Sequence, residues 1–170
     1  VDWAPDAMAD VLYSNAVFQW LRDHDALLPR LVANVRAGGI FAFQLPRNWT
    51  APSHAIINDL VAAGPHRAQL EPLLLRNPVG PPDYYYDLLR PHVRAIDIWE
   101  TEYLQILDGK NAVAEWTKGS VLKPLLDALA DDAAAAFYDQ YSTYVASQYP
   151  QRPDGKTLYP FRRLFVVARR

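Results

Sequence analysis

The sequence predicts an α/β fold built on a doubly wound sheet, and three observations favour it. Residues 11–13 form an apolar run with no polar face, which is typical of a central strand covered by helices on both sides. Apolar residues then recur at helical spacing over residues 25–35, and residues 40–45, IFAFQL, are typical of a second strand. A strand-helix-strand unit of this size is right-handed, so its two strands are expected to be parallel.

Composition favours one globular domain and excludes several classes of protein. The chain has 170 residues, of which 51% are hydrophobic, so it can bury a core. Its net charge of −2 comes from intermixed acidic and basic residues, which argues against a nucleic-acid surface. No apolar run is long enough to span a membrane and no signal peptide is evident, so a cytosolic protein fits best. The absence of cysteine excludes disulfides and Cys-ligated metal sites.

The first half of the chain predicts alternating elements with short breaks. The helix over 25–35 should be capped by Asp23 or His24 and should end at Gly38-Gly39. A loop is expected over 46–52, followed by a helix that Ser53 caps and that runs to about Ala63. Residues 65–82 contain several prolines and predict a short helical piece with irregular flanks.

The second half predicts a strand, a helical stretch and a closing strand. The expected elements are a helix over 83–89, a bent strand over 93–107 near the sheet edge, helices over 111–118 and 121–149, a turn over 150–155, and a last strand over 159–168. Tyr84, Tyr85 and Tyr86 cannot all face one way, so at least one should lie in the core. His24, His66 and His92 are interpreted as cap or surface residues, because no histidine spacing suits a metal site.

A ligand site is expected where the first strand ends. Ser14 and Asn15 interrupt the apolar run, and small polar residues at the carboxyl end of a parallel strand lie where open α/β sheets bind ligands. The residues alone do not say which ligand.

Six strings, in order along essentially the whole chain, make it resemble the S-adenosylmethionine-dependent methyltransferases that act on trans-aconitate. They are NAVFQWL at 15–21, GGIFAFQLP at 38–46, PSH at 52–54, DYY at 83–85, EWTKGS at 115–120 and the C-terminal run from Tyr149. The front departs from the family, since the seven glycines never form the G-x-G of a cofactor loop. By this resemblance, the chain is the C-terminal two-thirds of such an enzyme.

The resemblance implies the later strands of a Rossmann-like methyltransferase sheet with a helical lid insertion. Residues 1–170 would be the C-terminal part of a single domain, with the lid at about 108–150. The closing strand, at about 159–168, would enter antiparallel between the family's fifth and sixth strands.

The resemblance also implies the chemistry. A carboxylate of a small polycarboxylic acid, trans-aconitate in the family, would attack the methyl group of S-adenosylmethionine and give a monomethyl ester. A carboxyl group with a pKa near ~4 is already ionised at neutral pH, so no general base is needed. Orientation alone can lower a barrier by roughly 7–11 kcal/mol. We therefore expect cations, amides and tyrosines at the site, with no catalytic residue and no metal.

Candidate site residues follow from these strings and from residue type. Cofactor contacts are expected from Asn15, Ala16, Gln19 and Trp20, although Trp20 is equally well explained as plain core. A tricarboxylate needs cations and donors, and arginine suits bidentate capture. Substrate contacts are therefore expected from Arg47, His54, Trp116, Lys118, Arg162 and Arg163.

Each substrate candidate has a plainer alternative. Arg47 and His54 could be a solvated surface pair. The helix that carries Trp116 and Lys118 could simply pack on the sheet. Strand alternation could expose one residue of the Arg162-Arg163 pair.

Two functions from different classes stay open. The first is the carboxyl methyltransferase; the second is a non-catalytic α/β binding or assembly domain that lacks the cofactor half. The methyltransferase is preferred, because without further strands the strand at Val11 would be a bare apolar edge, which natural soluble domains avoid. The chain alone is expected to be inactive and to bind S-adenosylmethionine weakly or not at all, which calorimetric titration tests. No nucleic acid or membrane partner is expected, and the oligomeric state is left open.

Overall fold

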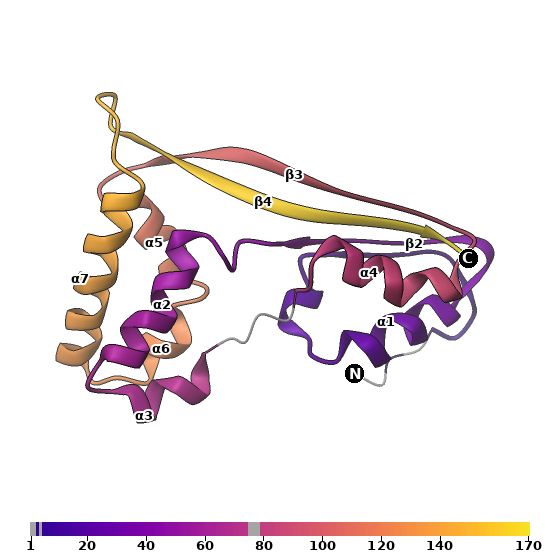
Figure 1. Cartoon of the computed structure of the whole chain (residues 1–170), viewed down its shortest axis with the longest axis horizontal. Helices are drawn as coiled ribbons and strands as arrows, with labels where there is room; N and C mark the ends of the chain where they lie inside the picture. The colour runs from indigo at the N-terminus through magenta and orange to yellow at the C-terminus, as the bar shows by residue number, and fades with distance from the viewer. Residues whose placement is uncertain (1–2, 4, 75–78) are drawn as a thin grey trace. The chain divides into compact units, whose positions relative to one another are not determined.

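The computed structural model of the chain, drawn in Figure 1, describes residues 3, 5–74 and 79–170. The chain forms two compact units. Unit 1 comprises Val1–Arg47, Asn77–Glu102 and Arg162–Arg170, and unit 2 comprises Asn48–Arg76 and Tyr103–Phe161. Within the described residues, no helix combines the length and the apolar character that crossing a membrane requires.

The chain forms a four-stranded mixed sheet. Its strands are β1 (Ala9–Asn15), β2 (Val35–Pro46), β3 (Ala95–Asp108) and β4 (Lys156–Arg169), in the spatial order β1-β2-β4-β3. Of these, β1, β2 and parts of β3 and β4 belong to unit 1. Strands β1 and β2 are parallel, whereas β4 runs antiparallel to β2. The predicted parallel pair, the edge position of β3 and the antiparallel entry of the closing strand are all confirmed.

The helices of unit 1 cover one face of this sheet. Helices α1 (His24–Ala33) and α4 (Pro82–Leu89) contact each other, and α1 packs on β2. The core that they enclose includes Phe41, Phe43 and Tyr85, whose rings lie within 5.3–6.2 Å of one another or of the Phe18 ring. Tyr85 is fully buried and Tyr86 is exposed, so the expectation that at least one residue of the tyrosine triplet is core is confirmed.

The prediction that the first strand is central and covered on both faces is wrong for this structure. Strand β1 is an edge of the four-stranded sheet, and Val11 and Tyr13 are 60% and 63% exposed. Both side chains lie on the sheet face opposite the buried aromatic core, because strand residues alternate between faces. The sequence pattern suggested a strand covered on both faces because Val11 and Tyr13 on the open face are also apolar.

The prediction that Gly38-Gly39 ends the first helix is also wrong. Helix α1 ends at Ala33, and strand β2 already begins at Val35. Gly38 adopts a φ of +78°, and a Cβ on Gly39 would lie 2.7 Å from the Asp10 carbonyl oxygen. The pairing register of β1 and β2 shifts in this region, so the glycines serve a strand irregularity at which backbones approach closely.

His24 is a buried residue, which corrects its interpretation as a cap or surface residue. It is the first residue of α1, while Asp23 at the N-cap makes no side-chain cap hydrogen bond. Its Nε2 lies 2.9 Å from the Phe18 carbonyl oxygen and its Nδ1 lies 3.1 Å from the Tyr85 hydroxyl. Both ring nitrogens therefore have partners inside unit 1.

Unit 2 is mainly helical. Its elements are the helices α2 (Pro52–Ala63), α3 (Arg67–Leu70), α5 (Ala112–Lys118), α6 (Lys123–Asp127) and α7 (Asp131–Gln148), with short 3-10 turns and the adjoining parts of β3 and β4. The long helix expected over 121–149 is interrupted at Ala128–Ala130. Ala51, not Ser53, is the N-cap of α2. Part of the irregular 65–82 stretch, residues 75–78, lies outside the described residues.

Helices α5, α6 and α7 occupy the range expected for the lid, and they share a core with α2. Ile57, Leu125, Tyr141 and Val145 are among the buried residues of that core. That these helices cover the ligand end of the sheet, within a single domain, stays a prediction.

Candidate functional site at the ends of β1 and β2

The carboxyl ends of β1 and β2 bring Asn15 and Gln44 together. The two residues are register partners in the parallel pair. The Gln44 side-chain Nε2 donates a hydrogen bond to Asn15 Oδ1, and the Ala16 backbone N–H donates to the Gln44 carbonyl oxygen at 3.0 Å. Gln44 is only 4% exposed, whereas Asn15 is open to solvent. The buried Gln44 thus fixes the end of β1 through hydrogen bonds, while the Asn15 side chain is accessible to solvent.

The turn after β1 contains a residue with a left-handed backbone conformation. Ala16 adopts a φ of +52°, in the left-handed region that non-glycine residues seldom occupy. Gln19 is buried, and its Nε2 donates to the Ala16 carbonyl oxygen at 2.6 Å. Among the described residues, no partner exists for the buried Gln19 Oε1. Trp20 is 52% exposed, so the alternative that it is plain core is wrong.

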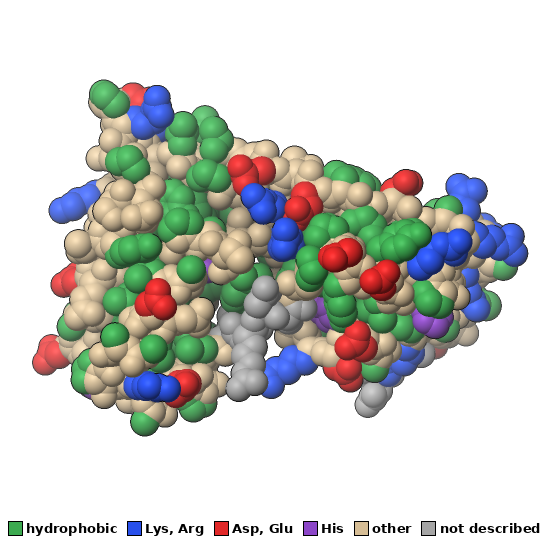
Figure 2. Space-filling view, in the orientation of Figure 1, with side chains coloured by type: hydrophobic (Ala, Val, Ile, Leu, Met, Phe, Trp, Pro, Cys, Tyr) green, Lys and Arg blue, Asp and Glu red, His purple; other side chains and the backbone are tan. Residues whose placement is uncertain are grey.

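Strand β4 adds cations near the carboxyl end of β2. Arg163 is the register partner of Pro46, and its Nη1 donates to Gln44 Oε1 at 2.9 Å. The neighbouring Arg162 lies 3.1 Å from a Glu102 carboxylate oxygen, and Arg47 pairs with Glu100. Figure 2 shows basic and acidic side chains next to one another over β3 and β4. Three of the six predicted substrate residues therefore lie in unit 1.

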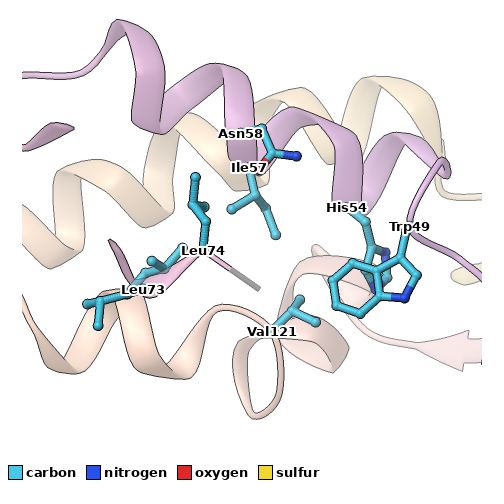
Figure 3. Close-up of a pocket in the computed structure, with 8 residues that line it drawn as sticks. Trp49, His54, Ile57, Asn58, Leu73, Leu74 and Val121 are labelled. Carbon is cyan, nitrogen blue, oxygen red and sulfur yellow. The ribbon is translucent and has the colours of Figure 1, made fainter. Parts of the chain in front are cut away.

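His54 lies in unit 2, at the first turns of α2. Its Nδ1 is 3.1 Å from Ser53 Oγ, and its ring meets the Trp49 ring edge-on with centroids 5.7 Å apart. Both rings line one end of a small hollow, across from Leu73 and Leu74 (Figure 3). Burial lowers the pKa of His54 to about 4. At neutral pH His54 is therefore an uncharged donor or acceptor, and not a cation.

Trp116 and Lys118 lie on α5 and face different partners. The Trp116 ring packs against Tyr159 and Phe161 of β4, with centroids 5.4 and 5.2 Å apart, as the packing alternative expects. Lys118 Nζ lies 4.6 Å from the centre of the Tyr138 ring. A contact of either side chain with substrate stays a prediction.

Gln44, Glu100 and Glu102 contact the candidate site residues, and the sequence did not single them out. Gln44 carried a signal, since it is the one polar side chain within the apolar run IFAFQL, next to the carboxyl end of the strand. The two glutamates carried none, because their arginine partners lie 53 and 60 positions away in sequence. Within the part of the chain that the structure describes, no group of three or more His, Asp or Glu residues could hold a metal ion.

Comparison with known proteins decides the family. The chain is 44% identical over 166 residues to a trans-aconitate 2-methyltransferase of Azoarcus sp. strain BH72, covering 98% of this chain and 65% of that protein. A trans-aconitate 2-methyltransferase of Rhodopseudomonas palustris strain BisB18 is 41% identical over 167 residues, with the same coverage. The chain belongs to their family. It spans about 65% of the length of these trans-aconitate 2-methyltransferases. No family model matches the sequence.

One solved structure supports the fold. A Bacillus halodurans protein assigned to the methyltransferases matches 99% of this chain and 72% of its own length, with a TM-score of 0.53 at 6% sequence identity. At that identity the match shows the fold alone. The predicted Rossmann-like α/β class is confirmed, as is the resemblance to the trans-aconitate methyltransferase family.

Proposed function

We propose that this chain supplies the later strands and the substrate side of an S-adenosylmethionine-dependent carboxyl methyltransferase. Its substrate would be a small polycarboxylic acid, with trans-aconitate the specific candidate. Two kinds of observation support this: the identity of 38–44% to enzymes of that name, and an amide-and-arginine cluster at the carboxyl ends of β1 and β2. The cluster is the single structural observation that carries the proposal.

The turn after β1 fits the cofactor assigned to it. S-adenosylmethionine supplies a methyl group on a positively charged sulfur. Asn15 offers an exposed carboxamide, and the buried Gln19 Oε1 is an acceptor without a partner among the described residues. The left-handed Ala16 sets the direction of the backbone between them, and the exposed Trp20 offers an apolar wall. Polar acceptors beside an apolar surface suit a cationic, partly apolar ligand.

The arginines fit the acid. Arg163 reaches the same strand end as Asn15 through Gln44, and its guanidinium can bind a carboxylate through two parallel hydrogen bonds. Arg47 and Arg162 already contact glutamates, so an incoming carboxylate would share or displace those partners. A polyanion with three carboxylates competes better for such sites than a monoanion does. We propose that Arg47, Arg162 and Arg163 together select for acids with several negative charges.

No group in this cluster has to move a proton. The carboxylates of a small acid are ionised at neutral pH, so the residues act by binding, orienting and excluding water. His54, Trp116 and Lys118 keep their proposed role as substrate contacts, with His54 acting as a neutral hydrogen-bonding group.

Transfer of a labelled methyl group tests the proposal. A protein that contains these 170 residues is incubated with labelled S-adenosylmethionine and, separately, trans-aconitate, citrate or acetate. Labelled monomethyl ester from trans-aconitate and none from acetate is the expected result, and the yield from citrate, which also has three carboxylates, shows how far shape adds to charge. A protein that binds a polycarboxylate without forming ester would favour the non-catalytic alternative. Labelling of acetate as readily as trans-aconitate would contradict selection by multiple arginines.

A further inference from the structure

Gln44 contacts both sides of the cluster at once. Its backbone carbonyl accepts from Ala16 N–H, its side-chain Nε2 donates to Asn15, and its side-chain Oε1 accepts from Arg163. The two residues that its side chain contacts lie 29 and 119 positions away in sequence. In the proposed function Asn15 contacts the cofactor and Arg163 contacts the acid.

We infer that Gln44 is a positioning residue that couples the cofactor side of the site, through Asn15 and Ala16, to the acid side, through Arg163. This inference rests on the proposed function for the identity of the two ligands. The linkage itself rests only on the hydrogen bonds of unit 1. Gln44 does not touch either ligand in this account; it sets the orientation of groups that do.

The chemistry of a carboxamide suits this role. A glutamine side chain donates through nitrogen and accepts through oxygen, so it can serve an amide acceptor on one side and a guanidinium on the other. Its own position is fixed, because Gln44 is buried in β2 between β1 and β4. A rotation that lengthens one side-chain hydrogen bond also changes the other, since the amide group is planar. Ordering of Arg163 by a bound acid is thereby transmitted to Asn15.

Gln44→Leu removes both side-chain hydrogen bonds and leaves an apolar side chain of similar size. We expect the KM for S-adenosylmethionine and the KM for trans-aconitate to rise together, each by about tenfold, with a smaller change in kcat. Gln69→Leu is the matched control, because Gln69 is an exposed glutamine of unit 2 whose side chain donates to the Ala128 carbonyl oxygen. It should leave both KM values within twofold. If Gln44→Leu changes only one KM, or neither, the coupling role is wrong.

A double-mutant cycle measures the coupling. Arg163→Met should raise the KM for S-adenosylmethionine about threefold when Gln44 is present, and should leave it unchanged in the Gln44→Leu background. Equal effects in the two backgrounds would overturn the inference. Urea unfolding of each variant at pH 7 shows whether a loss of activity reflects a loss of folding, and Gln44→Met provides a second substitution if Gln44→Leu does not fold.

NMR spectroscopy of the side-chain amides tests this inference separately from the proposed function. In the 170-residue chain, the side-chain amide signals of Asn15 should shift on Arg163→Met, and this response should disappear in Gln44→Met. If no polycarboxylate is methylated but this pattern appears, the proposed function fails and the linkage stands. If methylation occurs and the Asn15 signals ignore Arg163, the linkage fails alone.

Discussion

The polar clusters of the two units differ in where their hydrogen bonds lie. In unit 2, Ser53 Oγ lies 3.0 Å from the Tyr159 hydroxyl, Tyr141 donates to the Ser53 carbonyl oxygen at 2.9 Å, and Tyr141 contacts Thr117 Oγ1 at 2.8 Å. All four residues are fully buried. Burial raises the pKa of Tyr159 to about 12 and raises the pKa of Tyr141 too, so neither phenol ionises near neutral pH.

The cluster of unit 1 is instead buried only at its centre. Gln44 is inside, while Asn15, Arg47 and Arg162 reach solvent. The hydroxyl groups of unit 2 are enclosed between its helices, whereas carboxamide and guanidinium groups of unit 1 remain accessible to solvent. We therefore expect substitutions in unit 2 to change stability, and substitutions in unit 1 to change ligand binding.

The largest expected effect is the pH dependence that His54 gives to unit 2. Its pKa is about 4 when folded and 6.5 in the unfolded reference state, so the unfolded chain binds more protons between these values. The free energy of unfolding should fall by up to about 3 kcal/mol as the pH drops from 6.5 to 4, at about 1.4 kcal/mol per pKa unit. Urea unfolding of the chain at several pH values measures this.

His54→Gln is the control for that experiment, because glutamine does not titrate. The variant should lose most of the decrease in stability below pH 6.5. An unchanged pH profile in His54→Gln would assign the decrease to other groups and would contradict the burial of His54 as its cause.

The second effect is the loss of one buried hydroxyl. Tyr141→Phe leaves the Ser53 carbonyl and the Thr117 hydroxyl without this partner, which should cost about 1–3 kcal/mol of unfolding free energy. Tyr144→Phe, on the same helix but 37% exposed, should cost less than about 0.5 kcal/mol. Equal costs for the two variants would mean that the buried network does not stabilise unit 2.

The third effect is on binding in unit 1. Arg163→Met should raise the KM for trans-aconitate about tenfold, or roughly 1.4 kcal/mol, while the unfolding free energy changes little. Steady-state kinetics and urea unfolding are measured on the same preparation. The control is Lys123→Met, which removes the exposed ion pair between Lys123 and Asp127 on α6. A large loss of stability without a change in KM would place Arg163 with the structural groups of unit 2.

The smallest effect comes from a paired glutamate. Glu100→Gln removes the ionic partner of Arg47, and partly exposed ion pairs contribute only about 0–1 kcal/mol. We expect little change in stability and a two- to threefold lower KM for trans-aconitate, because the Arg47 charge is released. A higher KM would instead show that Glu100 orients Arg47 for binding.

Local sequence patterns predicted most helices and strands of unit 1 but few of the contacts between them. Apolar spacing and the string IFAFQL predicted the parallel β1-α1-β2 unit, and the family resemblance predicted where β4 enters. The role of Gly38-Gly39 was missed, because a glycine pair after a helix and one inside an irregular strand look alike in sequence. The mixed exposure of β1 was missed for a similar reason, since the apolar residues of an open face do not differ from buried ones.

The candidate site was predicted by residue type more than by arrangement. Asn15, Gln19 and Arg163 were chosen from family strings and charge, and they lie at one end of the sheet. Their connection through Gln44 could not be predicted, because it depends on strand register across 119 positions. His54 was chosen as a cation, and burial makes it neutral at pH 7.

Side-chain amide and guanidinium NMR of an active protein that contains this chain tests the central claim most directly. Addition of trans-aconitate with S-adenosylhomocysteine should shift the amide signals of Asn15 and Gln44 and the Nε–H signal of Arg163. The amide signals of Gln69 and Gln148, on the helices of unit 2, should stay in place. Shifts at Gln69 and Gln148 with none at Asn15, Gln44 or Arg163 would contradict the assignment of the site to the ends of β1 and β2.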